Sequence, residues 1–262
     1  MKSVIYETRG RAKEFNELAI NLFTGCGHRC VYCYGADVTH TDKRKFEMEP
    51  KPRVTADDIH KSARHWVETH PGEKRSILLC FVTDPYQPVE AETRLTRAAI
   101  EILHSLYLRV TILTKGGKRA TRDFDMLGPM DEFATTLTCV DDDKSLKWEP
   151  GAALPKERMD SLLEAHIRSI PTWVSLEPVI SPKDVETLIA RTMPWVGHYK
   201  VGTMNYHPHG KTINWHDFGW RIKRYMDSLG VKYYLKKDLK LAMGVAGNDV
   251  VDTWYRQERP NF

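Results

Sequence analysis

The stretch "TGCGHRCVYCYG", from Thr24 to Gly35, places three cysteines within eight residues. Thiolates are soft ligands that suit zinc ions or iron–sulfur clusters. A structural zinc ion takes four protein ligands, and His28 is a conceivable fourth ligand in this loop. A [4Fe–4S] cluster held by Cys26, Cys30 and Cys33 would instead keep one iron without a protein ligand, so that another molecule could bind there. The spacing therefore indicates a metal site, with zinc and a cluster as the two interpretations.

The composition is that of an ordinary globular protein. Of the 262 residues, 28% are charged and 41% are hydrophobic, and the formal net charge is +4. The N-terminal segment has no apolar run of signal-peptide length, and no window approaches the ~20 apolar residues of a membrane span. Five cysteines, an odd number, favour metal or redox chemistry over disulfides. We expect a cytoplasmic protein without a membrane segment, whose charge permits nucleic acid as a partner without requiring it.

Short β-rich runs alternate with helices along the chain, and no internal repeat is present. The predicted buried strands are 17–23, 76–83, 109–115, 132–138, 171–177, 198–203 and 231–237. Such alternation predicts parallel pairing with right-handed crossovers. We therefore expect an α/β protein with a partial (β/α)6-type TIM barrel, a doubly wound open sheet being the alternative. A single domain should span residues 1–262, with its core at about 17–205 and a helix–strand extension at about 206–262.

Several of the predicted helices have recognisable ends. Thr55 and Asp58 form a predicted capping box. Ser181 is a predicted N-cap before a proline at the first helical position, and Gly230 is predicted to end a later helix. Apolar stripes that would face the core lie at Ile59, Ala63, Trp66 and Val67, at Leu95, Ala99, Ile102, Leu103 and Leu106, and at Phe218, Ile222, Met226 and Leu229.

Polar residues follow the predicted strands, where a barrel concentrates its chemistry. They are Thr83–Asp84, Thr114–Gly117, Thr138–Cys139, Glu177 and Thr203–Asn205. Because the carboxyl ends of parallel strands open towards one mouth, we expect these residues to surround a common site.

The spacing Cys-x3-Cys-x-Tyr-Cys, just after the first strand of a parallel α/β unit, resembles that of the radical SAM superfamily. In that family the open iron of a [4Fe–4S] cluster binds S-adenosylmethionine (SAM), whose reductive cleavage yields a 5′-deoxyadenosyl radical that abstracts hydrogen from a substrate. The resemblance implies an enzyme with these two cofactors and an external electron donor of the flavodoxin or ferredoxin kind. It also implies that Cys26, Cys30 and Cys33 bind the metal at the catalytic centre.

Three further segments are similar to the branch of the superfamily that includes spore photoproduct lyase. They are "TDPYQPVE" (83–90), "ILTKGG" (112–117) and "WEPGAALPKERMDSLLEAH" (148–166). With the cysteine loop, this resemblance extends over more than half of the chain, from Cys26 to Pro178. It indicates the branch and not one particular reaction.

The resemblance implies five contacts with SAM. Tyr32 occupies the aromatic position against the adenine, with packing behind the cluster as the alternative. Thr83 and Asp84 match the strand end that meets the amino group, which a carboxylate suits, although Asp84 could simply begin a turn. Lys115 ends an apolar strand, where an ammonium needs an anion. It is expected to bind the SAM carboxylate with Thr138, or else to extend to the barrel rim.

Three more residues have two interpretations each. Glu177 leaves a buried strand at the expected mouth, where it contacts SAM or substrate or forms a structural ion pair. Tyr34 matches a tyrosine thought to relay a radical in spore photoproduct lyase, or it is a wall residue. Cys80 lies a residue or two before the place of that enzyme's hydrogen-donating cysteine. Because side chains alternate along a strand, we expect the Cys80 thiol in the core, which argues against photoproduct repair.

Two loop clusters resemble metal sites less well. His207 and His209 lack further ligands nearby, so we expect them in a loop that lines the substrate pocket. Asp141, Asp142 and Asp143 are expected in a solvated turn.

The expected substrate is a nucleobase in DNA or RNA, or a nucleoside. Cations near the mouth could neutralise phosphates while aromatic side chains stack on an extruded base. The cations are Lys43, Arg44, Lys45, Arg53, Lys115, Lys118 and Arg119, and the aromatic residues are Tyr86, Trp148 and Tyr206. A small molecule or a peptide is the alternative substrate, because fold analogy does not fix a reaction. More remote alternatives are a zinc-loop nucleic-acid-binding module and an iron–sulfur electron-transfer protein.

Overall fold

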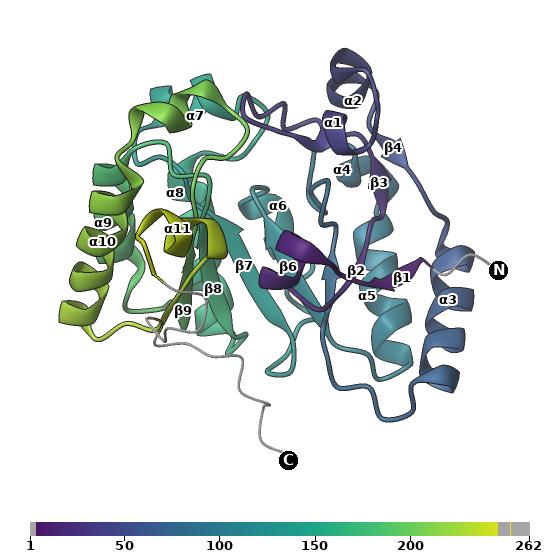
Figure 1. Ribbon diagram of the computed structural model, residues 1–262. Coiled ribbons are helices and arrows are strands. Elements are labelled where there is room, and N and C mark those ends of the chain that lie inside the picture. Colours follow the sequence, from purple (N-terminus) through teal and green to yellow (C-terminus); the bar gives the residue numbers. More distant parts are fainter. Residues whose placement is uncertain (1–3, 246–251, 253–262) are drawn as a thin grey trace.

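The computed structural model describes residues 4–245 and Asp252 (Figure 1). In that part of the chain, eight strands form one sheet in the order β1-β2-β5-β6-β7-β8-β9-β10. The first pair, β1 and β2, is antiparallel, and every other neighbouring pair is parallel. The strands are β1 Ile5–Glu7, β2 Leu18–Ile20, β5 Ile77–Leu79, β6 Val110–Thr114, β7 Glu132–Thr136, β8 Thr172–Leu176, β9 His198–Val201 and β10 Tyr233–Leu235.

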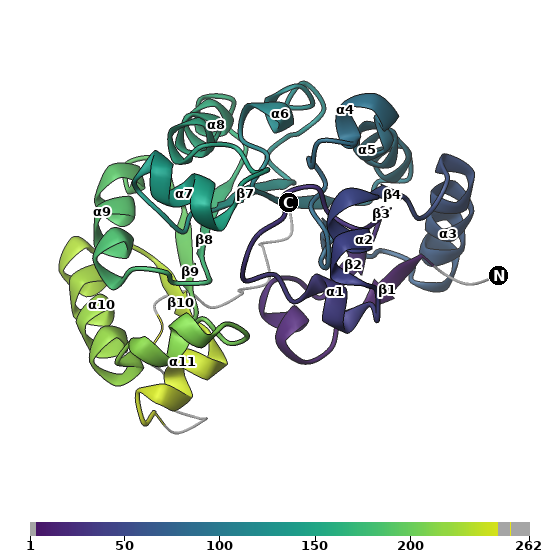
Figure 2. The ribbon, with the colours of Figure 1, turned by 90° about the horizontal axis from the view of Figure 1, so that it is seen from above.

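Helices connect the parallel strands and cover the outer face of the curved sheet, as Figure 2 shows from above. The longer ones are α3 Ala56–Thr69, α5 Leu95–Ser105, α8 Pro155–Ile167, α9 Pro182–Thr192 and α10 Trp215–Leu229. The strands follow one another in space as they do in the sequence, whereas the strand order of a doubly wound sheet reverses at one point. The expected partial barrel of the α/β class is therefore confirmed.

Shorter elements occupy the loops. They are η1 Gly10–Glu14, β3 Phe23–Thr24, α1 Gly35–Val38, α2 Lys43–Met48, β4 Lys51–Pro52, α4 Glu90–Thr93, α6 Lys118–Thr121, α7 Asp142–Trp148, η2 Pro208–Thr212 and α11 Lys237–Ala242. Strands β3 and β4 pair with each other on either side of the cysteine loop and its two small helices. The sequence predicts none of these short elements, because each carries too few residues to show a period.

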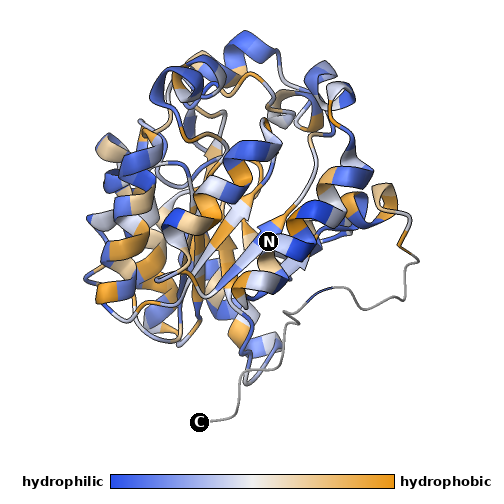
Figure 3. Ribbon diagram, turned by 90° about the vertical axis from the view of Figure 1, so that its left-hand side faces the viewer, coloured by the Kyte–Doolittle hydropathy of each residue, from blue (hydrophilic) through white to orange (hydrophobic). Residues whose placement is uncertain are grey.

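The core lies between the sheet and the covering helices, where the predicted apolar stripes are buried (Figure 3). In α3, Ile59 and Ala63 are fully buried. The capping box before them is confirmed, since the Thr55 hydroxyl accepts from the Asp58 amide and the Asp58 carboxylate accepts from the Thr55 amide. Gly230 ends α10 as predicted, with a φ of 65° that glycine adopts without strain.

Several strands end earlier than the sequence predicts. Strand β5 stops at Leu79, because Cys80 has a φ of 63° and turns the chain out of its extended path before Thr83. Strand β7 stops at Thr136, short of Thr138. The polar residues after these strands are therefore placed by loops and not by the alternation of a strand.

The N-terminus of α9 differs from the prediction in its cap. Pro182 occupies the first turn as predicted, but the Ser181 hydroxyl bonds to the Asp184 carboxylate at 3.1 Å and caps no backbone amide. The Asp141 side chain caps α7 by accepting from the Lys144 amide at 2.8 Å, so the expected solvated turn is the start of a helix.

The C-terminal part of the described chain contains the expected helix and strand. Strand β10 pairs with β9 and completes the sheet, and α11 follows it. Residues 246–251 and 253–262 of the expected extension lie outside the described part, and the division into core and extension stays a prediction. No helix among the described residues is long and apolar enough to span a membrane.

Candidate active site

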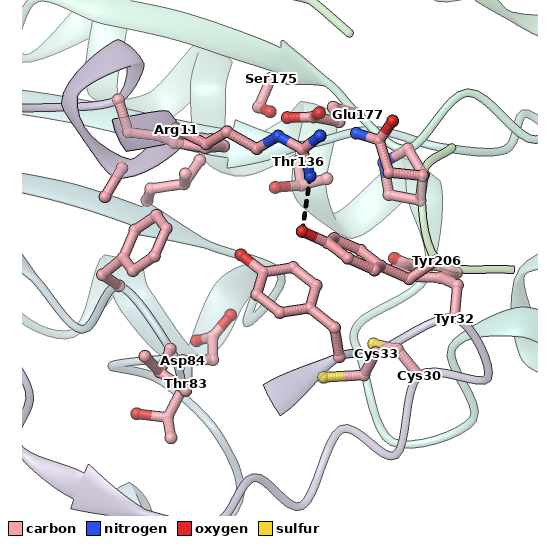
Figure 4. Close-up of a pocket in the computed structure, with 18 of the residues that line it drawn as sticks. Arg11, Cys30, Tyr32, Cys33, Thr83, Asp84, Thr136, Ser175, Glu177 and Tyr206 are labelled. Carbon is pink, nitrogen blue, oxygen red and sulfur yellow. Dashed lines mark hydrogen bonds between the residues drawn. The ribbon is translucent and has the colours of Figure 1, made fainter. Parts of the chain in front are cut away.

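A cavity of about 520 Å³ lies at the mouth of the barrel (Figure 4). The strand residues that line it are Leu78 of β5, Leu113 of β6, Thr136 of β7 and Ser175 of β8. The cysteine loop and the loops after the strands supply Cys26, Cys30, Tyr32, Cys33, Thr83, Asp84, Lys115, Glu177 and Lys236. The fold thus brings together every predicted site residue except Thr138.

The cysteine loop is held in place by hydrogen bonds from three other segments of the chain. The Cys26 amide donates to a carbonyl oxygen of α2 at 2.8 Å. The fully buried Gln87 side chain donates to the Gly25 carbonyl at 3.0 Å, and the Val31 amide donates to the Trp148 carbonyl at 2.8 Å. Gln87 and Trp148 belong to the segments "TDPYQPVE" and "WEPG". These two motifs therefore fix the cysteine loop, a role that the sequence alone did not reveal.

The thiols of the loop are free and face the cavity. Cys26 and Cys30 are buried and Cys33 is half-buried. Burial raises the pKa of Cys30 to about 12, although the nearby Lys115 ammonium opposes the rise. Burial also raises the pKa values of Cys26 and Cys33. The thiolate forms at neutral pH therefore depend on the positive charge of a bound metal.

His28 is not available as a metal ligand. Its Nε2 atom accepts from Arg119 at 2.8 Å, and its Nδ1 atom lies 3.4 Å from the Asp84 carboxylate. Burial lowers the pKa of His28, which agrees with a neutral ring between these partners. Among the described residues, no three His, Cys, Asp or Glu side chains come together as ligands of a single ion. The three thiols fit a cluster, in which each binds a different iron, and the zinc interpretation has no support.

Asp84 is buried and joins three loops. Its Oδ1 atom accepts from the Thr114 hydroxyl at 2.6 Å and the Tyr86 amide at 2.8 Å, and Oδ2 accepts from the Lys115 amide at 2.7 Å. Burial disfavours the charge, but the contacts with His28, Thr114 and the Lys115 amide outweigh it and lower the pKa of Asp84 well below its ordinary value. Both oxygens accept hydrogen bonds within the chain, so Asp84 orders the cavity wall, and its expected contact with SAM stays a prediction.

A second buried network lies behind Tyr32. The Tyr32 hydroxyl donates to the Glu149 carboxylate, whose other oxygen lies 2.6 Å from the Arg158 guanidinium. Arg158 also donates to the carbonyls of Ala153 at 2.8 Å and Thr136 at 3.0 Å. Burial disfavours the charge of Glu149, but Arg158 outweighs it and lowers the pKa of Glu149. The network holds the ring of Tyr32 in the cavity wall.

The family model of the Radical SAM superfamily matches residues 20–193, about two thirds of the chain. The chain belongs to this superfamily. The matched region contains the cysteine loop, Asp84, Lys115 and the Glu149–Arg158 pair, so the geometry described above is that of a radical SAM enzyme.

The chain is similar in sequence to one uncharacterized protein and in fold to solved structures that hold different bound molecules. A relative in sequence is the uncharacterized protein MJ0683 of Methanocaldococcus jannaschii, 27% identical over 192 residues that cover 71% of this chain and 70% of the relative. Spore photoproduct lyase complexed with dinucleoside spore photoproduct matches with a TM-score of 0.67 and 15% identity over 87% of this chain and 78% of that one. Streptococcus suis SuiB bound to the precursor peptide SuiA matches with a TM-score of 0.67 and 12% identity over 86% and 50%. At such identities the solved structures show a shared fold alone.

Lys115 of this radical SAM enzyme has an ammonium that is open to a ligand. Its Nζ atom lies 5.8 Å from the centre of the Tyr32 ring. No described residue accepts a hydrogen bond from this ammonium or forms an ion pair with it. Burial disfavours the charge, but Cys30, Glu149 and Asp84 outweigh it and raise the pKa of Lys115. The cation is therefore retained in a place where an anionic group can meet it.

Glu177 forms the structural ion pair that was one of its two interpretations. Its carboxylate pairs with the buried ammonium of Lys236, which follows β10. The Lys236 Nζ atom also lies 3.1 Å from the centre of the Phe15 ring. Burial lowers the pKa of Lys236, although Glu177 opposes the shift. The pair closes the side of the cavity opposite the cysteine loop, and the Glu177 side chain still lines it.

Two expected positions differ in the structure. The Thr138 hydroxyl lies 3.7 Å from the Cys139 sulfur, and Thr136 lines the cavity in its place. Cys80 is buried in the core as expected, but its thiol also lines the cavity. The argument from strand alternation fails for Cys80, because this residue lies beyond β5 with a left-handed backbone.

The predicted collar of cations and aromatic residues is only partly formed. Arg119 donates to the Tyr86 carbonyl at 2.9 Å and to His28, so it is an internal anchor. Tyr86 is buried with its hydroxyl bonded to Asp123 at 3.1 Å, so it cannot stack on a base. Residues 43–45 of α2 are exposed, but they are not among the residues that line the cavity.

Residues that the sequence did not single out form the outer mouth. Arg9 directly precedes η1 and Arg11 lies within it. Both line the cavity, and Arg11 donates to the Tyr206 hydroxyl at 2.5 Å (Figure 4). The rings of Tyr34 and Tyr206 are 4.8 Å apart. No local signal marks the two arginines, since only the path of η1 across the mouth brings them there. Glu149 was not singled out either, although it belongs to the segment 148–166 on which the resemblance rests.

Proposed function

We propose that this radical SAM enzyme binds a [4Fe–4S] cluster through Cys26, Cys30 and Cys33 and binds SAM in the same cavity. The observation that carries the proposal is the placement of three free thiols and the ammonium of Lys115 around one cavity. The bound cofactors would supply a carbon radical that abstracts hydrogen. A reducing cytoplasm suits the five free cysteines.

The residues of the chain bind, orient and enclose. Lys115 is assigned to the SAM carboxylate, because a half-buried ammonium that has no hydrogen-bond or ion-pair partner among the described residues gains from an anion. Asp84 fixes the amide of Lys115, and the Glu149 carboxylate fixes Tyr32 as a wall residue. The Ser175 hydroxyl lines the cavity, is buried, and has no hydrogen-bond partner among the described residues. It is thus a further hydrogen-bonding group for SAM or for the substrate.

Anaerobic reconstitution tests the proposal. The wild type should take up about four irons and four sulfides per chain, and it should release 5′-deoxyadenosine from SAM when dithionite is added. Cys30→Ala should abolish both results. Cys139→Ala is the matched control, because this buried thiol is not among the residues that line the cavity. Stoichiometric zinc without a cluster, or loss of activity in both variants alike, would contradict the assignment.

For the substrate we propose a nucleobase within DNA or RNA, or a nucleoside. The Tyr34–Tyr206 pair offers aromatic faces at the mouth, and Arg9 and Arg11 offer charges that suit phosphates. A second depression, which shares Met204, Asn205 and Tyr206 with the cavity, is lined by Lys211. Spore photoproduct lyase has been solved with a dinucleoside, whereas SuiB has been solved with a peptide, and a peptide remains the alternative substrate.

Salt-dependent binding tests this substrate. Single-stranded DNA and RNA should bind at low salt and weaken as salt rises, because cation–phosphate contacts release counterions. Arg9→Ala/Arg11→Ala should reduce both the affinity and its dependence on salt. Arg44→Glu/Lys45→Glu should change neither, since α2 does not line the cavity. Absence of binding by the wild type at low salt would exclude polymers and favour nucleosides or peptides.

A further inference from the structure

Helix α2 is attached directly to the cysteine loop through one residue, Phe46. The Phe46 carbonyl accepts from the Cys26 amide at 2.8 Å. Its ring is packed against Gly35 so closely that a Cβ there would lie 2.5 Å from the ring and 3.3 Å from the Cys33 sulfur. Phe46, Cys26, Cys33 and the neighbouring Ala36 form a small apolar cluster of their own. The inner face of α2 is therefore in contact with the proposed cluster ligands.

The outer face of the same region is exposed, basic and partly apolar. Lys43, Arg44 and Lys45 are all exposed, and no described residue forms an ion pair with Arg44 or Lys45. Val38 on α1 is 51% exposed and Met48 on α2 is 60% exposed. Helices α1 and α2 lie together at the upper rim in Figure 1. We call Val38, Arg44, Lys45 and Met48 the α1–α2 patch.

The position of the patch suits the delivery of an electron. Cys33 is the least buried of the three loop thiols, and it packs in one cluster with Phe46, which belongs to the same short helix as Arg44 and Lys45. Electron transfer falls steeply with distance, so a carrier has to dock where few atoms separate it from the acceptor. The cavity mouth is the competing route, but SAM and substrate occupy it in the proposed function.

We propose that the α1–α2 patch docks a small acidic carrier protein of the flavodoxin or ferredoxin kind, an inference that rests on the proposed function. In the step served by docking, one electron leaves the reduced carrier and enters the oxidised cluster, and no atom is transferred. Electron-transfer partners form small interfaces, below about 1,200 Å². Opposite charges around an apolar contact speed their association and make it sensitive to salt.

The affinity for flavodoxin is the first test, measured on the cluster-free protein so that activity plays no part. Flavodoxin should bind the wild type at low salt, and Arg44→Glu/Lys45→Glu should weaken binding about tenfold or more. The matched control is Lys183→Glu/Arg191→Glu, because these exposed cations of α9 lie outside the patch and carry the same charge change. The affinity of the control for flavodoxin should stay within about twofold of that of the wild type. The comparison is repeated at higher salt, which screens the effect of net charge.

A second variant and a second assay separate docking from folding. Val38→Ser/Met48→Ser removes the apolar contact without changing charge, and it should also weaken flavodoxin binding. In the reconstituted enzyme, flavodoxin should reduce the cluster more slowly in both patch variants, whereas dithionite should reduce all proteins alike.

The outcomes separate the two proposals. Equal affinity of the wild type and both patch variants for flavodoxin, or no binding by the wild type, overturns the docking site. Failure of dithionite to release 5′-deoxyadenosine in the wild type overturns the proposed function instead. Weakened binding of single-stranded DNA by the Arg44/Lys45 variant, with flavodoxin unaffected, would assign the patch to nucleic acid and contradict the carrier.

Discussion

The buried pair of Glu149 and Arg158 gives the sharpest prediction about stability. Its side chains are 0% and 1% exposed, and the closest oxygen and nitrogen lie 2.6 Å apart. We expect that Glu149→Leu and Arg158→Met each lower the free energy of unfolding by about 3–5 kcal/mol, because each leaves the other charge buried without its partner. The double variant should lose less than either single variant, since it removes both charges together.

The size of the loss follows from what remains around each group. After Glu149→Leu, the Arg158 guanidinium keeps only carbonyl acceptors, and the Tyr32 hydroxyl loses its acceptor as well. A buried donor left unpaired costs about 1–3 kcal/mol, which places this variant at the upper end of the range. For a chain of 262 residues such losses correspond to about 6–20 °C in the midpoint of thermal unfolding.

Guanidinium unfolding of the cluster-free protein, followed by far-UV circular dichroism, measures these losses. Lys156→Ala provides the comparison, because the Lys156–Asp160 pair has a similar distance, 2.8 Å, but lies on the surface. It should cost at most about 1 kcal/mol. The reasoning fails if the buried single variants cost no more than this surface variant. It also fails if the losses of the two single variants simply add in the double variant.

Three further predictions concern the loop and the cavity. Gly25→Ala should lower iron uptake on reconstitution, because the new Cβ would lie 2.5 Å from a carbonyl oxygen of α2. Gly72 has a similar φ, 76° compared with 79° for Gly25, but open surroundings, so the Gly72→Ala variant should take up iron normally. Asp84→Asn should be less stable than the wild type at pH 7, and this deficit should shrink as the pH falls below about 4. A carboxylate with a lowered pKa contributes its full stabilisation above its unfolded-state pKa and loses it as the pH falls towards its folded-state pKa. A deficit independent of pH would contradict the role of the charge. Lys115→Met should weaken SAM binding to the reconstituted enzyme about 10–150-fold, because a charge-assisted hydrogen bond is lost. Lys118 is an exposed neighbour, so Lys118→Met should bind SAM as the wild type does. Titration with SAM measures both affinities.

The amino-acid sequence by itself determined the cysteine loop and the class of fold. Three thiols within eight residues are a local pattern. The strands and amphipathic helices are predicted from the periodicity of apolar residues, which is also local. Both patterns can be read without knowing which distant residues meet. The capping box at Thr55 and the end of α10 at Gly230 are local in the same way, and the structure confirms both.

Only the tertiary structure decided which residues share the cavity and what each one contacts. The contact of Asp84 with SAM stays a prediction, but the structure shows that its oxygens also accept hydrogen bonds from β6, from the loop after β5 and from the loop after β6. No local pattern contains this set of partners. Thr138 was placed at the end of a predicted strand and Cys80 by the alternation of side chains along a strand. Neither argument applied once the strands ended early. Arg11 reaches the mouth only because η1 crosses it beside Tyr206, far away in sequence. Short-range patterns set the elements, whereas loops closing over the barrel set the site, because their geometry depends on contacts made across the whole chain.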